Sequence, residues 1–275
     1  MRDVLDVLAA SLLLLALFPA IASAATYWVS PTGASAWANC QGSVPLSGTD
    51  ACSLSTANTN AAAGDMVYLR GGIYGFSTQY GSALRPSNSG TASGEDIAWV
   101  VFANAPGEYP ELHGTPGLRQ WGLFIEGNSY VKIEGISFRY FSDSALIRNN
   151  AHHVEVAGCS FRDGGGFQMV EACAGGSQVT CYVSHLWVHN NTFSRLAAGG
   201  GCFGGSIAEG GDAVRIGYPP WTCGVPDADG NRICTQGLNH HITIEDNLME
   251  YAGHAVMDHY STETVVKNNV LHNEP

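Results

Sequence analysis

Lysine is almost absent from this chain of 275 residues, and several common motifs are missing as well. Only Lys132 and Lys267 occur, and the formal net charge is −12 at pH 7. Without a basic run, the chain lacks the electrostatic footprint of a nucleic-acid-binding protein. No Cys-x-x-Cys, Gly-x-Ser-x-Gly, His-Glu-x-x-His or phosphate-binding loop motif is present. The sequence therefore does not indicate a cysteine-ligated zinc site, a serine hydrolase, a zinc protease or a nucleotide-binding protein.

Long apolar runs are also missing after the first 25 residues. Leu12 to Leu17 and their neighbours form an apolar core, and Ala22-Ser23-Ala24 is a small-x-small cleavage site. This pattern is typical of a removable export signal, and the run is short for a membrane span. We expect residues 1–25 to be cleaved and the protein to be exported (extracellular, at the cell surface or periplasmic), without stable membrane insertion.

Eight cysteines fit an oxidising compartment. Proximity in the chain suggests three disulfides that each close a short loop: Cys40–Cys52, Cys173–Cys181 and Cys223–Cys234. Cys159 and Cys202 remain as a fourth expected pair.

One short pattern recurs along the second half of the chain. Two apolar residues alternate with polar ones, and a Gly, Asn or Asp and then a bulky apolar residue follow. The copies start at Val131, Val154, Leu186, Ile242 and Thr264. The closest copies are 22 and 23 residues apart, and the other intervals carry insertions. A fixed period with alternating apolar residues predicts a stacked solenoid of β-strands.

A second strand is expected before each copy of the repeat. Leu123, Leu146 and Val256 each lie eight residues before a repeat start, which predicts two registered strands per coil. Asparagine recurs at one repeat position, as Asn191, Asn247 and Asn269. Stacked at about 4.8 Å, these amides are expected to form a ladder at the bend after the strand.

The mature chain is expected to be one domain. Residues 26–115 would form an N-terminal cap and early coils, with a short helix over 55–63, and residues 116–275 the later coils. The chain stops directly after a predicted strand, at His272–Pro275. We expect that further C-terminal coils are missing from this sequence, the alternative being that a partner or swapped segment covers the open end.

The segments TYWVSPTG, GDMVYLRGGIY and IAWVVFANAPGEYPELHG, followed by the repeated coils, carry a family resemblance. Together they resemble the secreted right-handed parallel β-helix proteins of the pectate-lyase-like superfamily, over essentially the whole mature chain. The resemblance implies an all-β fold with an N-terminal cap and disulfide-closed insertions. It also implies a carbohydrate-active protein, either a polysaccharide lyase, a glycoside hydrolase, an epimerase or a protein without catalysis.

The first candidate chemistry is that of a calcium-assisted lyase on an acidic, uronate-containing polysaccharide. Such lyases pair Ca²⁺, held by oxygen ligands, with a Lys or Arg base. Repeat register places His189, Glu245 and Lys267 in one outward column. Lys267 is the candidate base, with Arg215 as the alternative, and Glu245 and Asp258 are candidate calcium ligands. A simple cross-strand ion pair is the competing interpretation.

The second candidate chemistry is that of an inverting glycoside hydrolase. Matching residues 210–218 with 252–260 places Asp212 beside His254 on neighbouring coils. This resembles faintly the Asp and His motifs of β-helix pectin hydrolases, in which two carboxyl groups flank the scissile bond. Asp258 is the third candidate residue for this chemistry. It falls in one register column with Ile125, Arg148 and Ile216, and the sequence leaves open whether that column points into the solenoid or outward. Other motifs of those hydrolases, a paired Asp and an Asn-Thr-Asp, are absent.

Aromatic side chains could stack on sugar rings. The candidates are Trp187, Trp221 and Tyr260, and packing beneath loops is the alternative for each. The only expected partner is a polysaccharide, and the oligomeric state is open. A non-catalytic glycan-binding solenoid remains the third function class, in which the charged columns are solvated ladders only.

Overall fold

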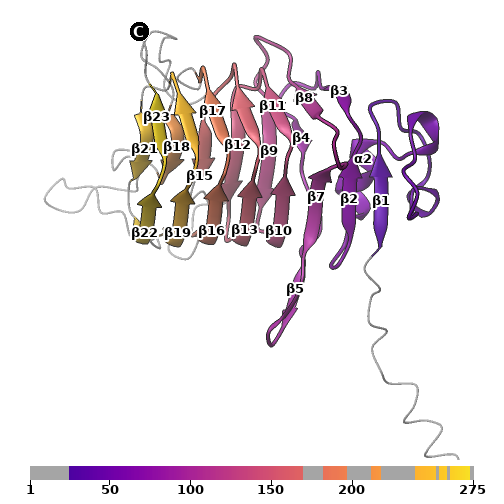
Figure 1. The fold of residues 1–275 in the computed structure, drawn as a ribbon, viewed down its shortest axis with the longest axis horizontal. Helices are drawn as coiled ribbons and strands as arrows, with labels where there is room; N and C mark the ends of the chain where they lie inside the picture. The colour runs from indigo at the N-terminus through magenta and orange to yellow at the C-terminus, as the bar shows by residue number, and fades with distance from the viewer. Residues whose placement is uncertain are drawn as a thin grey trace, which may run out of the picture.

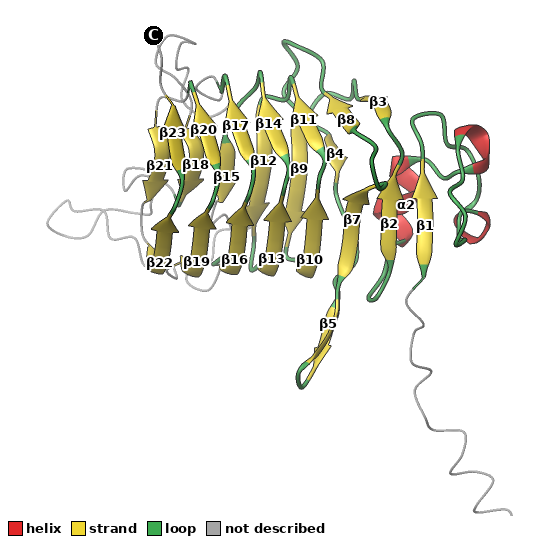
Figure 2. Cartoon of the chain, in the orientation of Figure 1, coloured by secondary structure: helices red, strands yellow, loops and turns green. Residues whose placement is uncertain are grey.

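The chain winds through three parallel β-sheets in turn, which gives a three-sided solenoid (Figure 1, Figure 2). The computed structural model describes residues 25–169, 182–196, 212–217, 239–251, 254–258 and 261–272. We name the three sheets A, B and C.

The strands of sheet A are, in spatial order, β1 (Thr26–Val29), β2 (Met66–Leu69), β7 (Val100–Asn104), β10 (Ser129–Glu134), β13 (His152–Ala157), β16 (Ser184–His189), β19 (Asn239–Glu245) and β22 (Ser261–Lys267). Those of sheet B are β3 (Gly72–Gly75), β8 (Pro110–His113), β11 (Ser137–Arg139), β14 (Ser160–Arg162), β17 (Thr192–Ser194), β20 (Leu248–Glu250) and β23 (Val270–His272). Sheet C holds β4 (Ser82–Leu84), β9 (Trp121–Glu126), β12 (Asp143–Arg148), β15 (Phe167–Met169), β18 (Asp212–Ile216) and β21 (His254–Asp258).

The repeat predicted from sequence is the register of sheet A. Val131 pairs with Val154, and the same column continues through Leu186, Ile242 and Thr264. Each coil has three strands, however, and the prediction of two was wrong. The bulky residue that ends the repeat, such as Phe138, lies on a separate strand of sheet B, because the Gly or Asn before it bends the chain.

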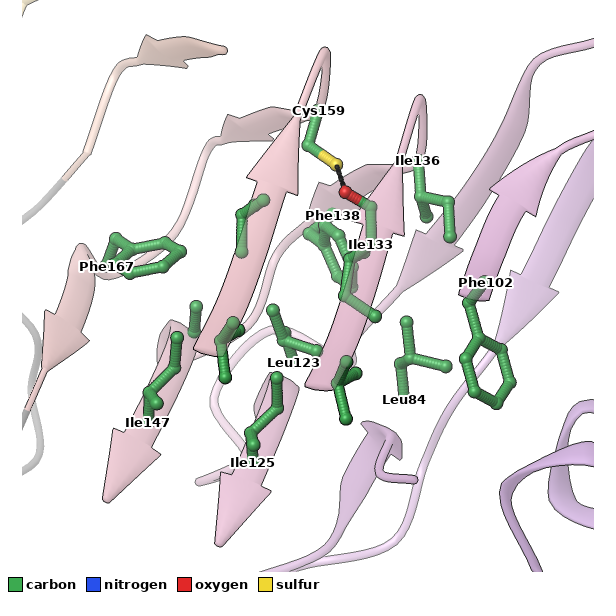
Figure 3. Packing of buried hydrophobic residues seen from close by; sticks show 14 of the residues in the cluster. Leu84, Phe102, Leu123, Ile125, Ile133, Ile136, Phe138, Ile147, Cys159 and Phe167 are labelled. Carbon is green, nitrogen blue, oxygen red and sulfur yellow. Dashed lines mark hydrogen bonds between the residues drawn. The ribbon is translucent and has the colours of Figure 1, made fainter. Parts of the chain in front are cut away.

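Alternation of apolar and polar residues sets which side chains fill the solenoid. On β10, Val131 and Ile133 are fully buried, whereas Lys132 and Glu134 face outward. On sheet B, Phe138, Phe161 and Phe193 stack with ring centroids 5.1 and 5.2 Å apart. Figure 3 shows how side chains from all three sheets meet inside the solenoid. Each coil buries its apolar face only against its neighbours, as in other solenoids.

The asparagine ladder is present at the bend between sheets A and B. Asn247 Oδ1 accepts hydrogen bonds from the backbone N–H of Asn191 (2.9 Å) and from its Nδ2 (3.0 Å). Asn247 Nδ2 donates in turn to Asn269 Oδ1 (2.9 Å). Asn191 and Asn247 are buried, so the ladder satisfies backbone groups that water cannot reach.

Two details of the predicted sheet C register were wrong by one residue. Leu123 pairs with Ala145 and not with Leu146, and Ile125 pairs with Ile147 and not with Arg148. The bend from β12 to β13 is one residue longer than the bend from β9 to β10. Asn149 and Asn150 both adopt positive φ there (56° and 63°), a conformation that asparagine tolerates well.

The N-terminal end carries the helix α2 (Leu54–Asn60), close to the helix predicted over 55–63. Ser53 caps it by accepting a hydrogen bond from the Thr56 backbone N–H (3.1 Å). The short helices η2 (Trp37–Asn39) and η3 (Gly48–Asp50) lie in the loop between β1 and α2. A hairpin of β5 (Thr91–Ser93) and β6 (Asp96–Ala98) projects from the solenoid (Figure 1).

Of the predicted disulfides, Cys40–Cys52 is present. Cys159 is a buried free thiol whose Sγ lies 3.8 Å from the Ile133 carbonyl oxygen, inside the solenoid (Figure 3). Burial raises the pKa of this thiol to about 12. The pairing of Cys159 with Cys202 is therefore not observed, because Cys159 points into the core. Cys202 and both cysteines of the pairs Cys173–Cys181 and Cys223–Cys234 lie outside the described residues.

Among the described residues, none belongs to a helix with the length and apolar character needed to span a membrane.

Candidate functional site

The outer face of sheet C carries a set of side chains that the core does not use. Leu123 and Ile125 of β9 point into the main core, whereas Phe124 and Leu146 form a separate cluster with Trp121. Trp121 lies in one register column with Asp143, and Asp212 with His254. We call this surface, from Trp121 to His254, the sheet C face.

One carboxylate organises the charged end of the sheet C face. Asp212 is buried, at 7% exposure, and forms an ion pair with Arg215, whose Nε donates to Asp212 Oδ2 (2.6 Å). The other oxygen, Oδ1, lies 2.8 Å from His254 Nδ1. The His254 side chain is 60% exposed. With Nδ1 held by a carboxylate, the imidazole presents Nε2 as its other ring nitrogen, which is the arrangement that orients a general base.

A second buried carboxylate, Asp143, lies on the same face. It was not among the site residues predicted from the sequence. It is 5% exposed. Burial raises its pKa above the ordinary value, although the charges of Arg119 and Arg215 and a hydrogen bond from Ser142 oppose this change. A carboxyl group with a raised pKa can hold a proton near neutral pH and deliver it, which is the property of a general acid.

Aromatic and arginine side chains adjoin these carboxylates along the solenoid axis. Trp121 is half-buried, and its ring lies 5.6 Å from that of Phe124. The guanidinium groups of Arg85 and Arg148 lie 4.8 and 4.9 Å from the Phe124 ring centroid, and both pair with Glu126. The face therefore offers an aromatic surface next to a cluster of charges, which suits an elongated polar ligand with apolar ring faces.

The predicted column on sheet A is present, but its groups are bound to one another. Lys267 pairs with Glu245 (2.7 Å), and Glu245 also accepts a hydrogen bond from Trp187 Nε1 (2.7 Å). Trp187 stacks on His189 at 3.9 Å between ring centroids. The hydrogen bond to Glu245 raises the pKa of Lys267, whereas a lysine base requires a lowered one. The cross-strand ion pair thus describes this column better than a catalytic base does.

Asp258 occupies an inward-pointing column, because its register partner Ile216 is fully buried. It is nevertheless exposed, on the last sheet C strand that the structure describes, and it accepts hydrogen bonds from Ser261 Oγ (2.6 Å). His254 is bound to Asp212 and not to Asp258.

The residues predicted to bind calcium do not form one donor set. Glu245 belongs to sheet A and is bound by Lys267 and Trp187, whereas Asp258 belongs to sheet C and is bound by Ser261. A Ca²⁺ site needs six to eight oxygen ligands converging on one point, and these two side chains do not supply one. Of the predicted sugar platforms, Trp187 is 43% exposed on sheet A, and Trp221 and Tyr260 lie outside the described residues.

A hollow of 440 Å³ lies on the outer face of sheet B, between Tyr109 and Arg162. Its carboxylate, Glu111, is paired with both His113 (2.6 Å) and Arg162. Burial opposes ionisation of Glu111, but the hydrogen bonds from His113 and Arg162 outweigh it and lower its pKa. This saturated carboxylate offers no acid or base near neutral pH.

The sequence held a partial signal for the sheet C face. Asp212 and His254 were found because two coils share a Gly-x-Ala-Val pattern. Asp143 and Trp121 belong to coils without that pattern. Because the bend after β12 is one residue longer than the bend after β9, counting back from the repeat starts did not place these two residues in one register column. The raised pKa of Asp143 comes from its burial, which depends on the fold and which the sequence pattern does not show.

No protein-family model matches the chain, and no curated protein matches it either. Among solved structures, the chain is similar to a rhamnogalacturonan lyase, with a TM-score of 0.51 and 13% identity. The match covers 91% of this chain and 62% of that one, so this chain spans less than two thirds of the neighbour's length. It is also similar to the alginate lyase from Paenibacillus sp. str. FPU-7, with a TM-score of 0.44, 15% identity and coverage of 78% and 75%. At these identities, the likeness to the rhamnogalacturonan lyase shows a shared fold and nothing further.

Proposed function

We propose that this protein is a polysaccharide lyase that cleaves an acidic, uronate-containing polysaccharide on the sheet C face. The observation that carries the proposal is the pair formed by buried Asp212 and exposed His254, 2.8 Å apart. The solved structure that shares the fold is named a rhamnogalacturonan lyase, which is consistent with this class. The proposal includes a right-handed winding of the solenoid, as expected for parallel crossovers. It also includes export of the protein, which the Cys40–Cys52 disulfide supports because disulfides persist in oxidising compartments.

Charge on the sheet C face supports an anionic substrate. The chain as a whole carries a formal charge of −12, yet Arg85, Arg119, Arg148 and Arg215 gather on or beside this face. A uronate carboxylate is planar and matches the fork of donors on a guanidinium. Trp121 gives a surface on which the apolar face of a neighbouring sugar can stack.

The proposed step is a β-elimination. His254, oriented by Asp212, removes the proton on the carbon next to the uronate carboxylate through Nε2. An arginine of the sheet C face, bound to the uronate carboxylate of the substrate, stabilises the negative charge that develops on that carboxylate. The electrons of the broken C–H bond form a carbon–carbon double bond, and the glycosidic oxygen leaves with the electrons of its bond to carbon. Burial raises the pKa of Asp143, and in this proposal its carboxyl group supplies the proton to that oxygen. No step is assigned to calcium, because Glu245 and Asp258 do not form one donor set.

One observation favours an inverting glycoside hydrolase as the second candidate. Ala145 and Val214 both pair with Phe167 of β15, and Asp143 and Asp212 each lie two residues before them, at the starts of β12 and β18. Two interstrand spacings separate β12 from β18, or about 9.6 Å between their backbones. Inverting hydrolases hold two carboxyl groups roughly 6.5–9.5 Å apart. In this alternative, Asp143 takes the place of Asp258, which the sequence prediction had grouped with Asp212 and His254. The lyase is preferred because both oxygens of Asp212 are already bound, Oδ2 by Arg215 and Oδ1 by His254.

The test follows the ultraviolet absorbance of the unsaturated uronate product. The full chain is incubated with a panel of polyuronates and glycosaminoglycans, with Ca²⁺ and then with chelator. We expect absorbance to rise on at least one substrate. His254→Ala should lower kcat by about 10²–10⁴-fold, the usual contribution of a general base. His254→Gln tests whether hydrogen bonding without proton transfer suffices, and His113→Ala is the matched control away from the sheet C face.

Other outcomes assign the other classes. Reducing ends without unsaturated product, lost in Asp143→Asn, would identify the hydrolase. Glycan binding without turnover, unchanged in His254→Ala, would identify a binding solenoid. Activity that depends on Ca²⁺ would show that the protein has a calcium site that does not combine Glu245 with Asp258.

A further inference from the structure

Histidines gather at one bend of the solenoid, away from the sheet C face. They lie where strands of sheet A begin, at positions repeated in three successive coils. The residues are His152 and His153 on β13, His185 on β16, and His240 and His241 on β19. In sequence, His153, His185 and His241 each directly precede a repeat start. We call these five residues the histidine ladder.

Backbone geometry turns the ladder outward. His153, His185 and His241 adopt positive φ, at 51°, 51° and 55°, which is uncommon for residues other than glycine. Their rings stack almost in parallel, with centroids 4.3 and 4.6 Å apart. The same conformation recurs at Tyr130 and Glu263, the equivalent positions of the flanking coils (φ 55° and 56°). The bend therefore sets this backbone conformation in each coil, and the imidazole side chains are what distinguish these three coils.

Three members of the ladder bring their ring nitrogens together. One nitrogen from each of His185, His240 and His241 lies within 4.8 Å of the others. His185 and His241 are exposed and His240 is half-buried, so an ion has access from solvent. The Nδ1 atoms of His240 and His241 are 2.7 Å apart. A carboxylate, Glu263, lies 2.8 Å from His241 Nδ1.

We propose that His185, His240 and His241 bind one divalent transition-metal ion, with Zn²⁺ as the defining case. Three imidazole nitrogens are a common zinc donor set, with bonds of about 2.0–2.1 Å and a fourth position left for water or a carboxylate. Tetrahedral geometry needs the nitrogens roughly 3.3 Å apart, and rotation of the two exposed side chains can bring them to this separation. Glu263 is placed to orient the His241 ring or to take the fourth position.

The test is a titration of the full chain with ZnCl₂ by isothermal calorimetry, after removal of metals with a chelator and dialysis. We expect one saturable site, with the affinity reduced at least tenfold in His185→Ala and in His241→Ala. The matched control is His152→Ala, which removes an imidazole from the same register column as His240 but from outside the donor set. Circular dichroism checks that each variant is folded.

A second measurement on the unaltered protein does not depend on variants. Diethyl pyrocarbonate modifies accessible imidazoles, and mass spectrometry locates the products. Zn²⁺ should protect His185, His240 and His241 and leave His254 reactive. Absence of saturable binding, equal affinity in all three alanine variants, or protection of histidines elsewhere would overturn the proposal. In those cases, the ladder serves only to stack the coils.

Discussion

At the scale of single residues, Asp212 links two side chains of different chemistry. One oxygen binds the guanidinium of Arg215 and the other binds Nδ1 of His254. A buried carboxylate with two such partners is fully satisfied, so its replacement should disturb the orientation of His254 more than the fold of the strand. Burial raises the pKa of Asp143, and this shift can be tested through the pH dependence of stability.

Asp143→Asn should stabilise the protein at high pH. Because the pKa of Asp143 is raised in the folded state, the unfolded chain releases this proton at lower pH than the folded chain does. Stability is therefore lost as pH rises from the unfolded pKa through the folded pKa, and asparagine removes this loss. The difference in Tm between Asp143→Asn and the unaltered protein should be positive at pH 8 and should shrink toward pH 4, measured by thermal unfolding.

The control for this measurement is Asp246→Asn, at an exposed position, which should show no such pH-dependent difference. A Tm of Asp143→Asn below that of the unaltered protein at pH 8 would mean that the ionised form stabilises the fold. Asp143 would then not serve as the acid of the proposed reaction.

Lys267→Ala should leave turnover unchanged within about twofold, as expected for an exposed ion pair outside the site. Lys267 is bound to Glu245, which raises its pKa and keeps it protonated. The Tm should change by roughly 2 °C or less, because exposed ion pairs contribute little. The measurement is kcat on the substrate found in the absorbance test. A loss of a hundredfold or more, with Lys267→Arg partly active, would return Lys267 to the role of base.

At the scale of elements, the asparagine ladder ties successive coils together at one bend. The Asn247 side chain makes four hydrogen bonds, two as acceptor from Asn191 and two as donor to the Val188 carbonyl and Asn269. Asn247→Ala leaves buried backbone groups without partners, at a cost of about 1–3 kcal/mol for each such group. We expect the free energy of unfolding in urea to fall by roughly 2–4 kcal/mol.

The matched control for the ladder is Asn190→Gly, one residue before Asn191 and exposed, because glycine adopts the positive φ of 55° at this position without strain. It should change the free energy of unfolding by about 0.5 kcal/mol or less. Equal effects of the two replacements would show that the ladder does not couple the coils.

The elements differ in how far the sequence predicted them. Sheet A was predicted because a strand with one buried face shows its register in the alternation of Val131 with Lys132. The third strand of each coil was not predicted. Segments such as Ser137–Arg139 have only three residues, which is too few to show an alternation of apolar and polar residues. The error at Leu146 came from one extra bend residue. Such a change in bend length has no effect on composition, yet it moves every later side chain by one position.

At the scale of the whole molecule, charge is distributed unevenly. The chain carries −12 formally, whereas the sheet C face collects arginines beside two buried carboxylates. A polyanionic substrate is therefore repelled at long range and bound at short range. Salt screens the long-range repulsion first, because the Debye length falls from about 30 Å at 0.01 M to about 8 Å at 0.15 M. The arginine contacts at the site are shorter than either length and persist.

We therefore expect kcat/KM on a long polyuronate to rise, by about threefold to tenfold, between 0.01 M and 0.15 M NaCl. The rise reflects faster encounter, so it should appear in kcat/KM and not in kcat. A uronate trisaccharide is the control, because its few charges are repelled weakly and its kcat/KM should change little. If kcat/KM on the polymer falls with salt instead, attraction to the arginines dominates at all distances, and a substrate of higher charge density would be favoured.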